Sequence, residues 1–340
     1  MPVKKRVCIY FAAIAIATAF SGNARAERWR MILDLEGRWK FTIGDNRKWA
    51  SPNYPDNDWE SIDVPSTWED EGFNGYNGYA WYRTSFDGAD LKSKGGMPFN
   101  LFMGYIDDVD EVFLNGHKIG ASGSFPPHYH TAYNAMRNYS IPNEYLNLQG
   151  KNVIAVRVYD SEVKGGIVSG DVGIFTNDDD NGLAVNLRGL WDFTLADRKF
   201  PSGPRVDYSE KHTPPEKAVW AKISVPGQWE HQGYPNHDGS AWYRKQFVVP
   251  KELKGEDLVL MLGKIDDFDQ TYLNGKLVGS TNQHDKFRIY YISSEAVNAG
   301  AMNLLLVFVD DPQGAGGIWE GPIGIMKQTE FTRYLRWRQR

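Results

Sequence analysis

Two acidic triplets stand out as residues that could do chemistry: Asp107-Asp108-x-Asp110 and Asp266-Asp267-x-Asp269. Paired carboxylates can serve as acid and base in a glycosidase, or ligate a hard cation such as Ca²⁺. They can also hold a turn by accepting hydrogen bonds at the start of a strand. Along a strand Asp108 and Asp110 would share one face and Asp107 the other, so the three would not converge. We therefore expect a structural role first, ligand contact second and a structural Ca²⁺ site third, and we assign no catalytic residue.

Arginines follow the acidic triplets or stand in a second repeated motif. The sequences Trp81-Tyr82-Arg83 and Trp242-Tyr243-Arg244 favour scaffold strands, in which Arg83 and Arg244 pair with buried carboxylates or carbonyl groups. The alternative is a stacking platform for a ligand. Arg137 and Arg288 occupy matching positions after the triplets, and they too are structural or ligand-contacting.

Aromatic and polar side chains in loops supply the candidate sugar-binding residues. Sugar recognition needs a flat aromatic face beside groups that satisfy hydroxyls, usually on loops held by a rigid scaffold. For the tryptophans of the Trp-Glu pairs, core packing is the favoured alternative, and exposed tyrosines are also common at domain interfaces. The two histidines of the His-Tyr-His segment have the spacing of a metal pair or a catalytic base, although such histidines are more often neither. The candidates are Trp68, Glu69, Tyr76, Tyr79, His128, Tyr129, His130, Trp229, Glu230, Tyr234, His237, Asp238, His284 and Trp319.

The elements that must position these residues occur twice in the chain. The period is near 150 residues, with small changes in offset that indicate loop insertions. A period this long indicates a duplicated domain rather than a solenoid, whose repeats run about 20–50 residues. The segments 35–42, 64–72, 80–86, 104–116, 137–141, 152–158 and 160–174 return in order as 187–194, 225–233, 241–247, 263–275, 288–292, 303–309 and 311–325.

The repeated segments predict β-structure. Residues 152–159 and 304–309 are short and rich in β-branched or aromatic residues. Residues 111–114 and 271–273 each run into Asn-Gly and a second apolar segment, which is the strongest short-range hairpin signal. No window predicts a long amphipathic helix. Each repeat is therefore expected to be an antiparallel β-sandwich.

The N-terminal segment predicts export. Lys4-Lys5-Arg6, an apolar run over 7–20 and Ala24-Arg25-Ala26 match a secretory signal peptide cleaved after Ala26. The run is short for a membrane anchor, which needs roughly 20 apolar residues. Removing 1–26 removes four basic residues and the single cysteine, and it changes the formal charge from −5 to −9. We expect a periplasmic or secreted bacterial protein without disulfides, a membrane span or a nucleic-acid partner.

The chain divides into five predicted parts. They are a signal peptide over 1–26, a first sandwich over 27–176, a polar linker over 177–182, a second sandwich over 183–328 and a basic tail over 329–340. The linker has the polar, acidic composition of a domain boundary. The tail could dock on an anionic surface, but an ordinary or frayed terminus is the favoured interpretation.

Several motifs keep the same order in both halves and carry a family resemblance: Gly-x-Trp-x-Phe, Val-Pro-x-x-Trp-Glu, Trp-Tyr-Arg, Ile-Asp-Asp-x-Asp-x-x-x-Leu-Asn-Gly and Gly-Gly-Ile. They resemble the galactose-binding-like jelly roll of the sugar-binding domain in family 2 glycoside hydrolases, and the related domain of sialate O-acetylesterases. The resemblance implies an all-β fold of two tandem galactose-binding-like jelly-roll sandwiches. In family 2 hydrolases a catalytic (β/α)₈ barrel of about 250 residues follows, and two sandwiches leave no room for it here. Neither a Gly-x-Ser-x-Gly elbow nor a His-Glu-x-x-His motif occurs in the sequence.

We therefore expect an exported carbohydrate-recognition protein with two non-catalytic sugar-binding domains. It would bind a glycan, or help a glycan-degrading enzyme to reach one, and would need no cofactor beyond the Ca²⁺ considered above. Two alternatives stay open. One is a glycoside hydrolase or carbohydrate esterase with a cryptic site between the domains. The other is an adhesion or structural protein whose aromatic residues form a protein interface.

Overall fold

The computed structural model describes residues 29–92, 98–180, 182–196 and 211–338. Its regular structure is mainly β-strand, arranged in four antiparallel sheets, which confirms the predicted all-β class. The signal peptide predicted over 1–26 lies outside the described residues. Within the described ranges, no helix has both the length and the apolar character needed to cross a membrane.

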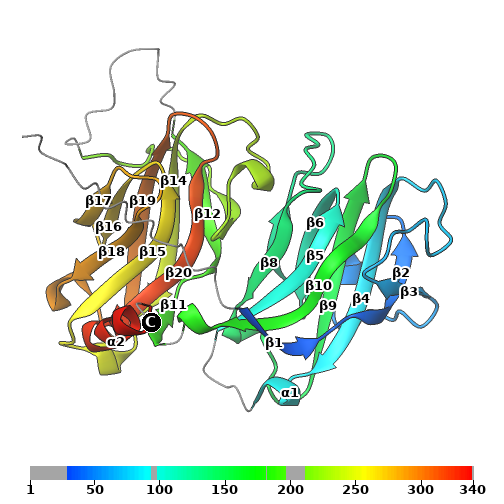
Figure 1. The fold of residues 1–340 in the computed structure, drawn as a ribbon, viewed down its shortest axis with the longest axis horizontal. Helices are drawn as coiled ribbons and strands as arrows, with labels where there is room; N and C mark the ends of the chain where they lie inside the picture. The colour runs from blue at the N-terminus through cyan, green and yellow to red at the C-terminus, as the bar shows by residue number, and fades with distance from the viewer. Residues whose placement is uncertain (1–28, 93–97, 181, 197–210, 339–340) are drawn as a thin grey trace, which may run out of the picture.

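The first half of the chain forms one four-stranded and one six-stranded sheet (Figure 1). In the four-stranded sheet the order is β1 (Trp29–Asp34), β10 (Gly166–Asn177), β5 (Phe99–Asp107) and β8 (Met136–Ile141). In the six-stranded sheet it is β3 (Glu60–Val64), β2 (Gly37–Ile43), β4 (Gly78–Asp87), β9 (Lys151–Asp160), β6 (Val109–Leu114) and β7 (His117–Ser122). Short helices lie in the connections: η1 (Arg47–Ala50), α1 (Ala89–Lys92), η2 (Asn143–Tyr145) and η3 (Asp178–Asp180).

The second half repeats both strand orders beside the first, as the internal repeat predicts. Its four-stranded sheet runs β11 (Leu183–Asn186), β20 (Gly317–Lys327), β15 (Leu258–Asp266) and β18 (Phe287–Ile292). Its six-stranded sheet runs β13 (Ala221–Val225), β12 (Gly189–Leu195), β14 (Gly239–Val248), β19 (Met302–Asp311), β16 (Phe268–Leu273) and β17 (Lys276–Thr281). Its remaining helices are η4 (Glu230–Gln232), η5 (Lys251–Leu253), η6 (Ser294–Ala296) and α2 (Gln328–Arg338).

Each half has its own hydrophobic core between its two sheets. In the first half, Phe41 and Tyr82 of the six-stranded sheet join Leu101 and Ile174 of the four-stranded sheet in one buried cluster. A corresponding cluster in the second half draws on the equivalent strands. Side chains alternate along the strands, so each sheet buries one face in the core. Each half is therefore a two-layer β-sandwich.

Both predicted Asn-Gly hairpins are present. In the β6–β7 turn, Asn115 and Gly116 have φ angles of 51° and 84°, and in the β16–β17 turn Asn274 and Gly275 have 50° and 81°. A two-residue turn of this hand requires positive φ at both positions, which Asn and Gly tolerate best. The two turns fix the register of β6 with β7 and of β16 with β17. The last aspartate of each acidic triplet lies in β6 or β16.

The chain ends in a helix, which the sequence analysis does not predict. Residues 328–338 form α2, so most of the basic tail predicted over 329–340 is helical rather than frayed. Phe331 and Tyr334 are three residues apart and share one helical face, and both are buried against Val259 and Met261 of the second half. In the segment predicted as a linker, Asn177 ends β10 and η3 follows immediately.

The two halves meet through the loop after β7. The Gly123 amide donates to the His231 carbonyl oxygen in η4 over 2.6 Å. Nearby, Met136 and Tyr139 from the first half face Gln228 of the second across a cavity of about 80 Å³. Beyond this loop, β7 and β8 of the first half also contact β12 and β13 of the second.

Candidate functional site

Three carboxylates cluster where the first half passes from one sheet to the other. Asp107 ends β5, Asp108 follows it, and Asp160 ends β9. One oxygen of each lies within 4.8 Å of the others. The expectation that Asp107 and Asp108 point apart is therefore wrong. Strand alternation does not apply across Asp108, because β5 and β6 belong to different sheets.

Four hydrogen bonds satisfy the Asp108 carboxylate. One oxygen accepts from the Tyr129 hydroxyl at 2.6 Å and from the Ser161 hydroxyl and amide at 3.0 and 3.1 Å. The other oxygen accepts from the Thr131 hydroxyl. Burial alone would raise the pKa of Asp108, but the hydrogen bonds from Thr131 and Tyr129 lower it. This carboxylate is thus held in its ionised form by neighbouring donors.

The two other carboxylates of the first cluster resist ionisation. Burial, together with the hydrogen bond to Asp108 and its charge, raises the pKa of Asp107 to about 7. Burial and the charge of Asp108 raise the pKa of Asp160 to about 7. Near neutral pH the three carboxylates therefore carry fewer than three negative charges.

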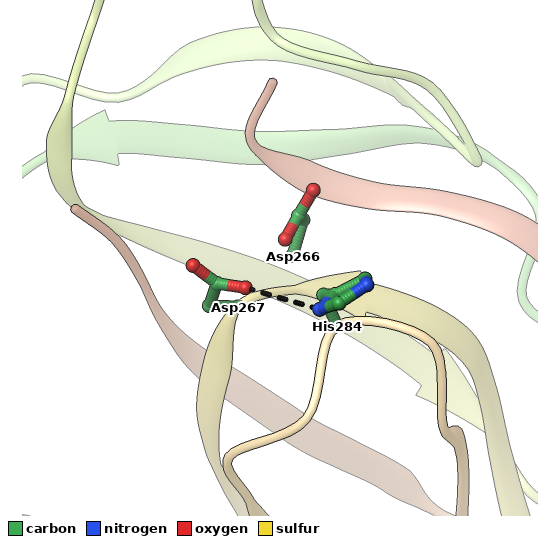
Figure 2. Close-up of side chains that lie close together, drawn as sticks. All are labelled: Asp266, Asp267 and His284. Atoms are coloured by element: carbon green, nitrogen blue, oxygen red, sulfur yellow. Dashed lines mark ion pairs between the residues drawn. The ribbon is translucent and has the colours of Figure 1, made fainter. Parts of the chain in front are cut away.

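The second half repeats the cluster with a histidine beside it. Figure 2 shows Asp266, Asp267 and His284 pointing toward one another, with His284 Nδ1 3.8 Å from an Asp267 oxygen. A ligand atom from each lies within 4.8 Å of the others. Asp311, the counterpart of Asp160, is fully buried at the end of β19. Burial and the Asp267 charge raise the pKa of Asp311 to about 7, and burial and Asp267 do the same for Asp266.

The third acid of each triplet belongs to a buried ion pair. Arg137 Nε lies 2.8 Å from Asp110 and Arg288 Nε lies 2.9 Å from Asp269, and all four side chains are 0% exposed. The same guanidinium groups donate to the carbonyl oxygens of Asp108 and Asp267, at 3.0 and 2.6 Å. Each arginine therefore fixes the backbone of its acid pair, which supports the structural interpretation over ligand contact.

Arg83 and Arg244 also take scaffold roles. Arg83 is buried, donates to Asp56 at 2.8 Å and to the Ser51 carbonyl oxygen at 3.0 Å, and so ties the loop after η1 to the sheet. Arg244 donates to Asp192 at 3.0 Å and lies 4.2 Å from the centre of the Trp220 ring. Neither guanidinium group forms a free platform for a ligand.

Four of the aromatic candidates are core residues. Trp68 and Trp229 are 0% exposed and lie in the two cores, so their assignment as sugar-binding residues is wrong. Tyr76 and Tyr234 are partly buried against the same cores. The Trp-Glu motif places its tryptophan inward because large apolar rings stabilise a sandwich most when they are removed from water.

The loop candidates of the first half have different partners. Tyr129 is 38% exposed and contacts Asp108, whereas His128 is exposed and His130 pairs through its backbone with Ser124. Tyr79 stacks at 5.9 Å with Phe125, beneath the Arg157 guanidinium group. Tyr129 is therefore the one predicted aromatic here that joins the carboxylates.

The remaining candidates separate into single polar contacts. Both oxygens of Glu69 are buried and accept no hydrogen bond from the described residues. Glu230 accepts from the Gly316 amide at 3.1 Å and Asp238 from the Gly314 amide at 3.2 Å, while the His237 ring lies 5.3 Å from that of Trp229. Trp319 lies on β20, with the Lys264 ammonium group 5.0 Å from its ring centre.

A groove of about 450 Å³ lies between the two halves and contains none of the predicted sugar-binding residues. No sequence motif marks it, because it forms only where segments from the two repeats meet. The one sequence feature that could have indicated the groove is that its lining residues differ between the two repeats. It is lined by Lys118, Ser140, Ile141, Pro142, Asn143, Glu144 and Tyr145 from the first half, and by Val185, Asn186, Arg188, Leu190, Lys222, Lys245, Gln246, Phe247 and Val248 from the second.

The charges in the groove are unevenly paired. Lys222 pairs with Asp192 at 2.6 Å, but Lys245 has no carboxylate within ion-pair distance in the described part of the chain. Lys245 donates instead to the Leu190 carbonyl oxygen at 2.9 Å. Burial, with a contribution from Lys222, lowers the pKa of Lys245 to about 8, although the charge of Glu144 opposes this change. Donors and acceptors thus face the same space from both halves.

Comparison with known proteins relates part of the chain to β-galactosidases. Residues 44–163 match the family model described as the second all-β domain of β-galactosidase. The β-galactosidase BoGH2A of Bacteroides ovatus is 30% identical over 156 residues, which cover 42% of this chain and 17% of that protein. The chain thus spans about a sixth of the length of this curated relative. These matches support a domain related to family 2 glycoside hydrolases in the first half.

Two solved structures show weaker similarity over more of the chain. A β-glucuronidase of Bacteroides uniformis is 17% identical with a TM-score of 0.38, covering 84% of this chain and 28% of that one. A β-glucuronidase from an uncultured Clostridium species is 14% identical with a TM-score of 0.34, covering 78% and 40%.

Proposed function

We propose that this chain is an exported, non-catalytic carbohydrate-recognition protein whose glycan lies in the groove between the two halves. The observation that carries the proposal is the groove itself, about 450 Å³ in volume and lined by side chains from both sandwiches. Ligand sites are commonly concave, 300–1,000 Å³ in volume and placed at domain interfaces. The sequence of residues 1–26 supports the export part of the proposal.

The groove offers the chemistry that a sugar needs. Lys245 and Asn143 can donate to hydroxyl oxygens, and Glu144 can accept from hydroxyl groups. Tyr145 contributes an aromatic ring, which stacks at 4.3 Å on His117 and is thereby held in place. A sugar ring presents both hydroxyl groups and an apolar face, so this mixed lining suits it better than a purely charged or apolar ligand.

The carboxylates support a non-catalytic role. Glycosidases place their two carboxyl groups about 5–5.5 or 6.5–9.5 Å apart, with the substrate between them. An oxygen of Asp107 and an oxygen of Asp108 instead lie within 4.8 Å of each other, and donors from the protein occupy Asp108. This arrangement leaves no space between the two carboxyl groups for a glycosidic bond.

The decisive experiment is a binding screen on residues 27–340, by glycan array followed by affinity electrophoresis. The match to β-galactosidases makes β-galactosides the first ligands to test. For the ligand found, we expect Lys245→Ala and Asn143→Ala to weaken binding at least tenfold, because both remove a donor from the groove. Tyr129→Ala, outside the groove, serves as the matched control and should bind normally.

Three outcomes would contradict the proposal. If Tyr129→Ala loses binding and Lys245→Ala does not, the ligand lies at the loop end of the first sandwich. If the wild-type protein hydrolyses aryl glycosides or acetylated sugars and Asp108→Asn abolishes that turnover, the protein is a hydrolase. If no glycan binds but a protein partner does, the groove serves adhesion.

The pH dependence gives a second test of the same site. Because the pKa of Lys245 is about 8, its ammonium group loses its proton well below the usual range for lysine. A ligand oxygen held by that group should therefore bind more weakly as the pH rises from 7 to 9. Binding by Lys245→Met should show no such decline, and a decline of equal size in the variant would exclude Lys245 as the contact.

A further inference from the structure

We propose that the second half binds a divalent transition-metal ion, of the Zn²⁺ or Mn²⁺ class, between Asp266, Asp267, Asp311 and His284. Asp266, Asp267 and His284 each offer a ligand atom within 4.8 Å of the others (Figure 2), and the charge of Asp267 also acts on the buried Asp311. The argument rests on comparing this cluster with its counterpart in the first half. The two clusters share their carboxylates but differ in what satisfies them.

The first difference is the loop that covers the cluster. In the first half thirteen residues, 123–135, connect β7 to β8, and this loop supplies Tyr129 and Thr131 as donors to Asp108. In the second half only five residues, 282–286, connect β17 to β18. The shorter loop has no counterparts of those two donors, and it places His284 beside Asp267 instead.

The second difference is the identity of the residue that follows Asp160 in the first half and Asp311 in the second. Ser161 follows Asp160 and gives Asp108 two hydrogen bonds, from its amide and its hydroxyl group. Pro312 follows Asp311 in the second half. Proline has neither an N–H nor a hydroxyl group, so both donors are lost. Asp267 therefore lacks every protein donor that its counterpart Asp108 has.

The third observation is an unsatisfied buried oxygen. Asp311 is 0% exposed, and its Oδ1 accepts from the Gln313 amide at 3.0 Å. Its Oδ2 is buried and has no hydrogen-bond partner among the described residues. Asp311 lies close enough to Asp266 and Asp267 for their charges to interact. A buried carboxylate oxygen is costly to leave unpaired, and a cation would satisfy it together with Asp267.

The ligand set indicates the class of ion. Ca²⁺ and Mg²⁺ prefer oxygen ligands alone, whereas Zn²⁺ and Mn²⁺ also accept an imidazole nitrogen beside carboxylates. His284 is largely exposed, with a side-chain exposure of 66%, so it can turn its ring toward an ion without displacing the core. The two carboxylates and the imidazole supply three ligands, and the unpartnered Oδ2 of Asp311 is the fourth ligand of the proposed site.

The test is metal titration of residues 27–340 by isothermal calorimetry after treatment with a chelator. Zn²⁺, Mn²⁺ and Ca²⁺ are titrated separately. We expect one saturable site for Zn²⁺ or Mn²⁺ per chain, weakened at least tenfold in Asp267→Asn and in His284→Ala. Asp108→Asn, the matching change in the first half, should keep the site, with circular dichroism confirming the fold of each variant.

A variant that keeps every ligand gives an independent test. Pro312→Ser restores the amide and hydroxyl donors that Asp108 receives from Ser161, so it should weaken metal binding several-fold by satisfying Asp267 internally. The proposal is overturned if no ion binds saturably, if Asp267→Asn binds at full strength, or if Ca²⁺ alone binds and His284→Ala leaves it unchanged. Equal losses in Asp108→Asn and Asp267→Asn would also overturn it.

Discussion

The charge of Asp107 links the stability of the first half to pH. Its pKa is about 7 in the folded protein, against 3.8 in the unfolded chain, because of burial and its contact with Asp108. The folded state therefore binds more protons between these values, so this group's contribution to stability is complete below pH 3.8 and is lost as the pH rises through 7. Asp107→Asn keeps a donor to Asp108 without the charge. After allowance for solvent screening, we expect it to be more stable than the wild type at pH 8 by about 1–2 kcal/mol.

Thermal unfolding of both proteins at pH 5 and pH 8 measures this effect. The wild type should lose more stability than Asp107→Asn between the two values. Asp63→Asn is a suitable control, because Asp63 is exposed and its ion pair with Arg38 is long, at 3.7 Å. Equal pH dependence in the wild type and Asp107→Asn would show that this carboxyl group does not carry the linkage.

The buried and exposed ion pairs of the second half predict very different costs of removal. Arg288 and Asp269 are both 0% exposed, whereas the side chains of Arg333 and Glu330 are 75% and 38% exposed. Removing one partner of a buried pair leaves an uncompensated charge, so Arg288→Leu should destabilise the second half by about 3–5 kcal/mol. Arg333→Leu should change stability by less than about 1 kcal/mol. Denaturant unfolding of the two variants checks the contrast, and similar losses would contradict it.

At the scale of elements, an irregularity in β15 depends on one glycine. Gly263 has a φ of +58°, at the point where the register with β20 shifts, and an added Cβ would lie 1.7 Å from the Glu320 carbonyl oxygen. Gly275 also has a positive φ, of +81°, but nothing lies within 4 Å of its Cβ position. Gly275→Ala should therefore lose only the stability that a residue with a Cβ loses in the left-handed conformation, about 1–2 kcal/mol.

Gly263→Ala adds a collision with backbone to that loss, so its total cost should exceed about 3 kcal/mol. Equilibrium unfolding of both variants measures the difference. Should the two alanine variants be equally stable, the close approach of β15 and β20 at this point would be wrong.

The elements differ in how well local sequence predicts them. The β6–β7 and β16–β17 hairpins follow from Asn-Gly alone, because the turn requires residues that tolerate positive φ. Helix α2 cannot be predicted from local sequence. It is stabilised by the packing of Phe331 and Tyr334 on β15, and β15 lies far from the helix along the chain. The convergence of Asp107 and Asp108 was missed for a similar reason: strand alternation was applied across a residue where the chain changes sheets.

At the scale of the whole molecule, the sequence shows that the domain is duplicated, but it does not show the groove that forms between the two copies. The repeat predicts two equivalent strand orders, and both are present. The groove between the halves uses Glu144 from one copy and Lys245 from the other, which are not equivalent positions and share no motif. Likewise, the difference between Ser161 and Pro312 can be interpreted only from the structure, which shows that Ser161 donates to Asp108.

The separate cores predict that the two halves unfold independently. Leu114 and Leu273 are counterparts at the ends of β6 and β16, 0% and 1% exposed, and each lies in the core of its own half. The two core clusters share no residue. Calorimetry should therefore resolve two transitions. Leu114→Ala should reduce the free energy of unfolding of the first half by about 2–5 kcal/mol, because it leaves a cavity in that core, and so lower the temperature of that half's transition. Leu273→Ala should do the same to the second half.

The same experiment locates the proposed metal, because a ligand that binds only the folded state stabilises the unit that holds it. Zn²⁺ or Mn²⁺ should raise the transition that Leu273→Ala lowers and leave the other unchanged. A single transition that both leucine variants lower equally would mean that the groove and the Gly123–His231 contact couple the halves into one cooperative unit. In that case a ligand bound in either half would stabilise both.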